Sequence, residues 1–279
     1  MTDAPAGPRD DHHPGPDPRP DLLAGYLARV GLDGDHDPTP ADLQRAHVRA
    51  ITYENLDVTL GREIRLDLPG LVAKLVDSRR GGYCYEQNTL FAAVLEARGA
   101  DVVRCLGRVR IGNATEPRPA THMVLLVDGC VVDVGFGAAT PLGPVPLDGE
   151  ATYGGWTWRT ARTTTPEGED AWQMCLSDHL LYTFTDDPRH PTDYIAPNHY
   201  SSTHPRSVFT GLPIVQRSDD QVQTILVGLT LTERYPDGTE RTDAVAPRDY
   251  AALLRHRFGL ALGDDEVARL LAAATAPPA

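Results

Sequence analysis

The spacing of apolar residues changes at Gly99, and this change limits the possible folds more than any other feature of the sequence. Before Gly99, apolar residues recur every three or four positions, as they do on one face of a helix. After Gly99 they fall in short strand-like runs with a period of two, separated by turn residues. We therefore expect an α+β protein. A helical unit over residues 21–99 precedes an antiparallel sheet or small barrel, and a third region from about residue 197 contains a β-hairpin and two helices.

Capping residues mark where the expected helices begin and end. Asp21 and Thr39 are candidate N-caps, because a side-chain oxygen at that position accepts a hydrogen bond from the first helical turn. The helix that begins near Cys84 runs to Gly99, a residue type common just after a helix C-terminus. Residues 1–20 are rich in proline and nearly free of large apolar residues, so we expect a disordered extension there.

The net charge of −13 argues against a general nucleic-acid-binding protein, which needs an excess of basic surface. No apolar run approaches the roughly 18–20 residues that a membrane span requires. The N-terminus also lacks the basic-then-apolar pattern of a signal peptide. We expect a cytoplasmic protein without nucleic-acid or membrane partners. Any phosphate site has to be a local feature, since the overall charge does not attract anions.

The four cysteines lie far apart and form no C-x-x-C pair, which argues against a zinc site and a disulfide framework. We expect no bound metal. Cys105, Cys130 and Cys175 lie in apolar, strand-like runs and are interpreted as small core residues. Cys84 differs, because it follows a pair of glycines and falls in the first turn of a helix. A helix N-terminus and a nearby imidazolium both lower the pKa of a thiol, as a nucleophile requires.

His122 and Asp133 are predicted to be neighbours in a β-hairpin. A two-residue type I′ turn at Asp128-Gly129 would set the register. The two side chains are then diagonal neighbours on one face, about 7–8 Å apart at the backbone and within reach of a hydrogen bond. An aspartate flanked by valines is costly to bury unless it is paired, and His122 is the obvious partner. Two interpretations remain: a structural polar pair with a core cysteine, or a Cys/His/Asp triad.

Four segments, taken in order, resemble the motifs of one enzyme family. "RRGGYCYEQN" resembles the signature R-G-G-x-C-x-E-x-N, and "ITYENLDV" resembles a helical I-P-F-E-N-L segment upstream of it. "THMVLLV…VVDVGFG" resembles the family's histidine and aspartate strands, and "NHYSSTHPRSVF" resembles N-x-x-x-S-T-x-P-x-S-x-F. These are motifs of the arylamine N-acetyltransferases. The similarity runs from about Tyr26 to "RFGLAL" near the C-terminus, nearly all of the chain after residue 20.

The resemblance implies a fold and a reaction. The fold is a helical first domain, a β-barrel second domain and an α/β lid, with the bounds 21–99, 100–197 and 198–279. Cys84 would be acylated, His122 would be its base, and Asp133 would orient His122. Acetyl-CoA would donate the acetyl group to an arylamine, arylhydrazine or N-hydroxyarylamine in a ping-pong reaction. No metal or tightly bound cofactor is implied.

The loop and helix around Cys84 carry further expected roles. Glu86 and Asn88, in the first turns of the helix, are expected to brace the loop, and Arg80 is a further candidate for this role. The backbone N–H of Cys84 is a natural donor to the oxyanion that forms during acyl transfer.

The resemblance also implies substrate contacts. Three aromatic residues line the acceptor pocket in the family, and they correspond here to Tyr53, Phe136 and Phe209. Tyr53 departs from the usual phenylalanine, and its hydroxyl favours a polar acceptor. Gly137 is a candidate for close backbone approach to the pyrophosphate of CoA. Plain core packing is the alternative interpretation of the three aromatic residues.

The closest alternative activity is that of an amide synthase with the same fold. Such an enzyme takes a polyketide chain from an acyl carrier protein and releases or cyclises it onto an aryl amine. Two more distant alternatives are a papain-like cysteine peptidase and a non-catalytic binding protein of this fold.

Overall fold

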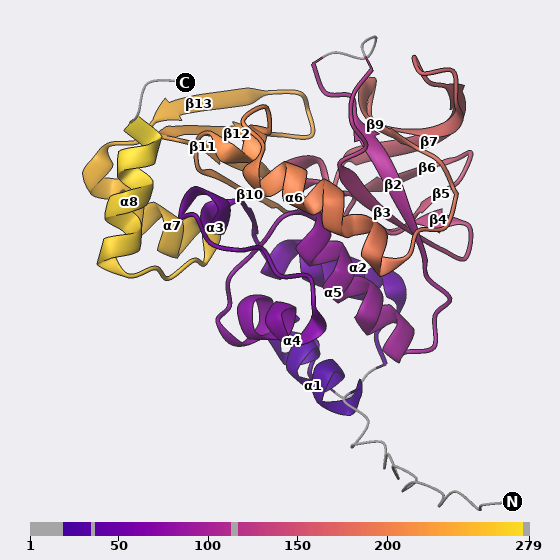
Figure 1. Ribbon diagram of the computed structural model, residues 1–279, viewed down its shortest axis with the longest axis horizontal. Helices are drawn as coiled ribbons and strands as arrows, with labels where there is room; N and C mark the ends of the chain where they lie inside the picture. Colours follow the sequence, from indigo (N-terminus) through magenta and orange to yellow (C-terminus); the bar gives the residue numbers. More distant parts are fainter. Residues whose placement is uncertain (1–18, 35–36, 113–116, 276–279) are drawn as a thin grey trace, which may run out of the picture.

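The first part of the chain is helical in the computed structural model, which describes residues 19–34, 37–112 and 117–275 (Figure 1). Its helices are α1 (Arg19–Val30), α2 (Pro40–Ala50), α3 (Leu56–Thr59), α4 (Leu68–Leu71), the π-helical continuation η1 (Val72–Asp77) and α5 (Cys84–Ala97). The extension expected over residues 1–20 lies outside the described residues except for its last two, and α1 begins at Arg19 rather than after Asp21. Among the described residues, no helix is both long and apolar enough to span a membrane.

Capping contacts fix the helix ends. The Thr39 hydroxyl accepts a hydrogen bond from the N–H of Asp42 at 3.2 Å, and the Asp42 carboxylate accepts one from the N–H of Thr39 at 2.9 Å. This capping box confirms Thr39 as the N-cap of α2. Helix α5 begins at Cys84, and Gly99 follows its C-cap with φ +86°, a left-handed conformation that favours glycine. Both predicted ends of α5 are therefore confirmed.

Helix α5 lies at the centre of the main core. Its residues Leu90, Phe91, Val94 and Leu95 are buried, as predicted from their helical spacing. They belong to one cluster of apolar side chains that joins the helices to the following sheet. Burial of each such side chain stabilises the fold by about 1.5–3 kcal/mol. The first turn of α5 is thereby held in a fixed position against its neighbours.

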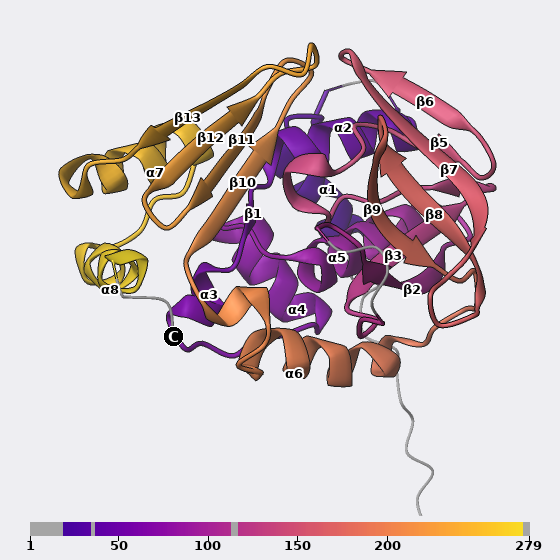
Figure 2. The ribbon, with the colours of Figure 1, turned by 90° about the horizontal axis from the view of Figure 1, so that it is seen from above.

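Eight antiparallel strands form one sheet in the middle of the chain, in the order β5-β4-β3-β2-β9-β8-β7-β6. Their bounds are β2 (Val103–Val109), β3 (His122–Val127), β4 (Cys130–Val131), β5 (Val145–Pro146), β6 (Glu150–Tyr153), β7 (Trp156–Thr164), β8 (Asp170–Leu176) and β9 (His179–Phe184). The sheet curls into a nearly closed barrel (Figure 2). The α+β class and the barrel are therefore confirmed.

The last part of the chain adds an antiparallel sheet in the order β1-β10-β11-β12-β13, with two helices against it (Figure 2). The elements are β1 (Tyr53–Glu54), β10 (Ile214–Ser218), β11 (Gln223–Val227), β12 (Thr230–Arg234), β13 (Glu240–Ala244), α7 (Tyr250–Phe258) and α8 (Asp264–Thr275). Helix α6 (Ile195–Thr203) and the 3-10 turn η4 (Val208–Thr210) connect the barrel to this sheet. The turn between β12 and β13 contains Pro236-Asp237-Gly238, as predicted.

The helical conformation expected for "ITYENLDV" is wrong at residues 53–54. Tyr53 pairs with Gln216 and Glu54 with Val215, so these two residues form the edge strand β1 of the C-terminal sheet. On its other side, the N–H of Glu54 donates to the carbonyl of Gly82 at 3.1 Å. These long-range hydrogen bonds hold the backbone extended until α3 begins at Leu56.

Further contacts hold α3 and β1 against the C-terminal helices. The Thr52 hydroxyl donates to the carbonyl oxygen of Phe258 at 2.6 Å, a bond that proline at this position could not make. A second apolar cluster joins α3 to the C-terminal sheet and helices through Leu56, Leu60, Val215, Leu226, Tyr250, Leu254, Phe258, Leu260 and Leu270. Residues of α3 thus share one apolar cluster with the C-terminal sheet and helices.

Candidate active site

Cys84 is the first residue of α5 and is almost fully buried. The glycines before it are required by space: a Cβ on Gly81 would lie 1.8 Å from the carbonyl oxygen of Thr52, and one on Gly82 would lie 2.5 Å from Glu86 Oε2. The Cys84 Sγ lies 3.7 Å from the carbonyl oxygen of Thr121, the residue before His122. The unpaired N–H groups of the first helical turn favour negative charge beside them.

His122 and Asp133 form the hydrogen bond that the hairpin register predicts. Asp128 and Gly129 both have positive φ values, +49° and +73°, as a type I′ turn requires. Val127 pairs with Cys130 across that turn. His122 Nε2 then lies 2.7 Å from Asp133 Oδ2, and both residues are buried.

The Asp133 carboxylate accepts hydrogen bonds from three groups besides His122. Tyr182 Oη donates to Oδ2 at 2.9 Å, while Asn88 Nδ2 and the backbone N–H of Gly135 donate to Oδ1 at 2.9 Å and 2.8 Å. A buried carboxylate with this many donors is fixed in both orientation and charge. Since His122 Nε2 faces Asp133, Nδ1 is the ring nitrogen left to exchange a proton with Cys84.

Continuing the register of the Asp128-Gly129 turn along the hairpin places Gly135 opposite His122. A Cβ on Gly135 would lie 2.7 Å from the Cα of Cys84 and 2.8 Å from Asn88 Nδ2. Glycine is thus needed there because the end of the hairpin touches the start of α5, which brings Asp133 and Cys84 into one site.

The electrostatics of the pair favour a charged imidazole. Burial disfavours the imidazolium, but the Asp133 carboxylate outweighs burial, and the pKa of His122 is raised to about 9. Burial likewise opposes ionisation of Asp133, yet His122 holds the pKa of that carboxyl below its usual range. At neutral pH the site therefore holds an imidazolium beside the Cys84 sulfur.

A buried ion network supports the loop that carries Cys84. Lys74, the single lysine of the chain, lies 2.7 Å from both Asp57 and Glu86. Arg80 lies 2.8 Å from Glu54 and 3.2 Å from Asp57. The two cations therefore link three carboxylates beneath the start of α5.

Two carboxylates of this network hold the loop backbone directly. Glu54 Oε1 accepts a hydrogen bond from the N–H of Gly81, and Glu86 Oε2 accepts one from the N–H of Tyr83, both at 3.2 Å. Glu86 thus contacts the loop directly, as expected. Arg80 contacts it through Glu54. Asn88 instead contacts Asp133 and the carbonyl oxygen of Met123.

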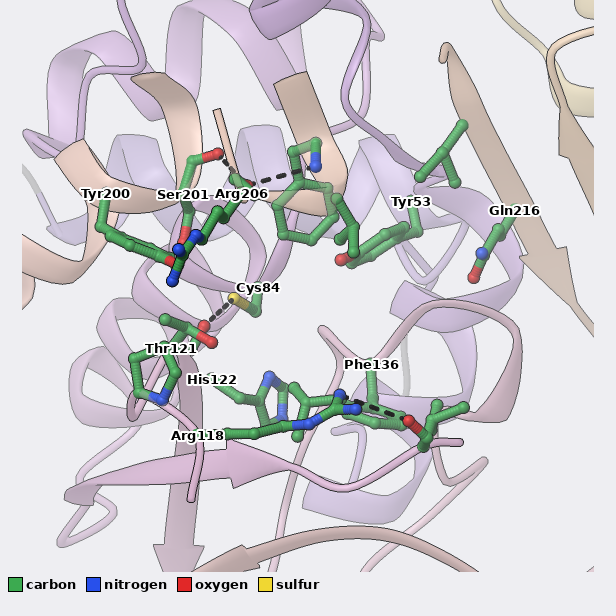
Figure 3. Close-up of a pocket in the computed structure, with 17 residues that line it drawn as sticks. Tyr53, Cys84, Arg118, Thr121, His122, Phe136, Tyr200, Ser201, Arg206 and Gln216 are labelled. Carbon is green, nitrogen blue, oxygen red and sulfur yellow. Dashed lines mark hydrogen bonds between the residues drawn. The ribbon is translucent and has the colours of Figure 1, made fainter. Parts of the chain in front are cut away.

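A cavity of about 520 Å³ opens over Cys84 and His122 (Figure 3). All three aromatic residues expected at the acceptor pocket, Tyr53, Phe136 and Phe209, line it. The ring of Phe136 lies edge-on to His122 with centroids 4.8 Å apart. The cavity thus presents flat apolar surfaces next to a thiol and an imidazole.

The polar residues of the cavity wall that were not predicted include Arg118, Arg206 and Gln216. Arg206 lies within the "NHYSSTHPRSVF" segment, so that motif was a signal that could have indicated it. Arg118 precedes the predicted His122 strand by a few residues, without a motif of its own. Gln216 reaches the cavity only because β10 pairs with β1, which no local pattern indicated.

Gly137 lies beside the cavity but is not one of the residues that line it. Its φ is +68°, and a Cβ there would lie 2.0 Å from Gln216 Oε1, which accepts a hydrogen bond from the N–H of Ala138 at 2.7 Å. The approach of Gln216 thus accounts for glycine at this position. The contact with CoA expected for Gly137 stays a prediction.

Comparison with known proteins relates the whole arrangement to one group of enzymes. A family model described as N-acetyltransferase matches residues 39–267. The arylamine N-acetyltransferase of Mycolicibacterium smegmatis is 41% identical over 258 residues, which cover 87% of this chain and 93% of that protein. The structure of the arylamine N-acetyltransferase from Mycobacterium abscessus superposes with a TM-score of 0.85 at 38% identity, covering 91% of this chain and 95% of that one. The structure of the Mycobacterium marinum arylamine N-acetyltransferase in complex with CoA superposes with a TM-score of 0.82 at 32% identity. The match covers 90% of this chain and 98% of that one.

Proposed function

The chain belongs to the arylamine N-acetyltransferase family, and on this premise we propose that it moves an acetyl group from acetyl-CoA through Cys84 to an aromatic amine. One observation carries the assignment of Cys84. It starts α5 inside a cavity lined by aromatic residues, where the His122–Asp133 pair, 2.7 Å apart, supplies an imidazolium.

In the first half-reaction the Cys84 thiolate attacks the thioester carbonyl of acetyl-CoA. A new C–S bond forms to Cys84, the C–S bond to CoA breaks, and the departing CoA thiolate takes the proton of the His122 imidazolium. The backbone N–H of Cys84, at the start of α5, is the donor to the oxyanion that forms in between.

In the second half-reaction the amine attacks the acetyl-Cys84 thioester. The neutral imidazole of His122 removes the proton from the attacking nitrogen, and the Cys84 thiolate leaves as the amide forms. The imidazolium and thiolate are thereby restored. Asp133, held by Tyr182 and Asn88, keeps the imidazole in one orientation throughout.

The donor and acceptor assignments rest on the cavity and the relatives. The M. marinum relative was solved with CoA, and two guanidinium groups, Arg118 and Arg206, line the cavity here. Arylamines, arylhydrazines and N-hydroxyarylamines are flat molecules that fit against Tyr53, Phe136 and Phe209. The relatives described above give no support to an amide synthase that takes a chain from an acyl carrier protein. A cytoplasmic location stays a prediction.

Mass spectrometry of the protein after mixing with acetyl-CoA tests this function. We expect one acetyl adduct, on Cys84, that disappears on addition of an aromatic amine with release of the acetylated amine. Cys84→Ala should abolish the adduct, whereas Cys105→Ala, at a buried cysteine of the barrel, should keep it. An adduct on another cysteine, or an adduct that amines do not remove, would contradict the proposal.

A further inference from the structure

Two polar groups face the cavity from paired strands. Tyr53 of β1 and Gln216 of β10 are direct partners in the antiparallel register, so their side chains project from the same face of the sheet. Both side chains line the cavity that contains Cys84. In Figure 3, Tyr53 lies between Cys84 and Gln216, and Arg206 lies on the other side of Cys84.

The Tyr53 hydroxyl has no hydrogen-bond partner among the described residues. Its ring is held against Phe209, with centroids 6.3 Å apart, so the hydroxyl occupies a defined place in the cavity. Burial, and after it the nearby Cys84, raises the pKa of Tyr53. The group is therefore a protonated hydroxyl that can donate one hydrogen bond.

The Gln216 side chain is oriented by its neighbours. The backbone N–H of Ala138 donates a 2.7 Å hydrogen bond to the Gln216 side chain. Because a backbone N–H can only donate, the atom that accepts it is the side-chain carbonyl oxygen Oε1. The glycine at position 137 leaves the space that this contact needs. The NH₂ group of Gln216 is left as a donor without a protein acceptor among the described residues.

We propose that Tyr53 Oη and Gln216 Nε2 form an acceptor subsite for the ring substituent of the amine. It selects aromatic amines that carry a hydrogen-bond-accepting oxygen, such as a ketone, over amines of equal shape that lack one. This inference rests on the proposed function. With the amine at Cys84 and the ring against the aromatic wall, an accepting oxygen satisfies both donors. An apolar substituent leaves both unpaired, which costs binding free energy.

The test compares two amines of matched shape, 4-aminoacetophenone and 4-isopropylaniline, with acetyl-CoA as donor and free CoA as readout. The measured quantity is the ratio of kcat/KM for the ketone to kcat/KM for the alkyl amine. Intrinsic differences in amine reactivity cancel when this ratio is compared between the unmodified protein and its variants. Tyr53→Phe keeps the ring and removes the donor. Gln216→Glu keeps an oxygen for the N–H of Ala138 and removes the NH₂ group.

We expect each variant to lower the ratio by about three- to tenfold, the effect of one hydrogen bond. Tyr235→Phe and Gln221→Glu are matched controls in turns outside the cavity, and both should leave the ratio unchanged. Acetylation of Cys84 by acetyl-CoA is measured in each variant as a separate check on the donor half-reaction. An unchanged ratio with normal acetylation of Cys84 would overturn the subsite alone. Failure of the unmodified protein to acetylate Cys84 or either amine would overturn the proposed function and the subsite with it.

Discussion

Asp133 controls the charge of the candidate site. It is buried, it accepts four hydrogen bonds, and its carboxylate raises the pKa of His122 to about 9 in spite of burial. The imidazolium beside Cys84 therefore persists across the neutral pH range and is lost only as the pH rises through about 9. The reactivity of Cys84 should depend on this carboxylate more than on any other single group.

Asp133→Asn tests that dependence. The substitution keeps the shape and removes the charge, so the pKa of His122 should fall and the imidazole should become neutral near pH 7. We expect the rate of Cys84 alkylation by iodoacetamide at pH 7 to drop by about tenfold or more. The measurement is the alkylation rate against pH. Asp128→Asn, in the hairpin turn, is the control. Identical profiles for Asp133→Asn and the unmodified protein would show that the carboxylate does not activate the thiol.

Tyr182 shows which site residues a sequence can and cannot indicate. The sequence alone could predict the roles of Cys84, His122 and Asp133. A helix start and a two-residue turn are local features, and their geometry follows from the spacing of residues. Tyr182 lies on β9, which joins β3 only through β2 and the closure of the barrel. Its hydrogen bond to Asp133 depends on that long-range pairing, and no local signal marks it.

Among the secondary-structure elements, the start of α5 depends on the ion network beneath it. Glu86 is buried in its first turn and bonds both the Tyr83 N–H and Lys74. Burial raises the pKa of Glu86 to about 7, even though the charge of Lys74 acts in the opposite direction. The folded state therefore prefers Glu86 neutral below about pH 7, whereas an unfolded carboxyl titrates near 4.3.

Lys74→Met should remove about 3–5 kcal/mol from the free energy of unfolding, because Glu86 and Asp57 lose a buried partner. Without Lys74 the charged form of Glu86 is still less favourable. Glu86 is mostly charged at pH 8 and mostly neutral at pH 5.5, so the substitution should lower the free energy of unfolding more at pH 8. Urea unfolding at the two pH values measures both effects. Arg65→Met breaks an exposed pair with Asp67 and should change little. A loss for Lys74→Met that is equal at both pH values would contradict the role given to Glu86.

Strand β1 marks the limit of prediction from local patterns. Its two residues lie between expected helices, and the motif "ITYENLDV" favoured a helix. The strand forms only because β10, far along the chain, offers an unpaired edge. The helices, the hairpins and the α+β class follow from periodicity and turn residues, whereas the contacts that close the cavity follow from tertiary pairing.

For the whole molecule, the net charge of −13 opposes the approach of an anionic donor. The cavity counters this locally with Arg118 and Arg206, and neither guanidinium group has a carboxylate partner among the described residues. Arg118 instead donates to the carbonyl oxygen of Ile111 at 3.3 Å. These guanidinium groups are suited to the phosphates of CoA.

Arg206→Gln should raise the KM for acetyl-CoA by about tenfold, the value of one charge-assisted hydrogen bond. It should leave the KM unchanged for S-acetyl-N-acetylcysteamine, a donor thioester that lacks phosphates. Steady-state kinetics with both donors measure the difference, and Arg241→Gln, on the exposed strand β13, is the control. If the KM rises equally for both donors, Arg206 acts on the cavity shape and not on phosphate.

The pairing of β1 with β10 also has a consequence for the nascent chain during synthesis. The ribosome releases Cys84 and its loop long before β10, because more than half of the chain separates β1 from its partner strand. During that interval β1 lacks its partner strand, and Gln216 has not yet been synthesised. Helix α7, whose Phe258 carbonyl oxygen accepts the hydrogen bond from Thr52, has not been synthesised either. Cys84 therefore lacks its complete substrate cavity until β10 has been synthesised and has paired with β1.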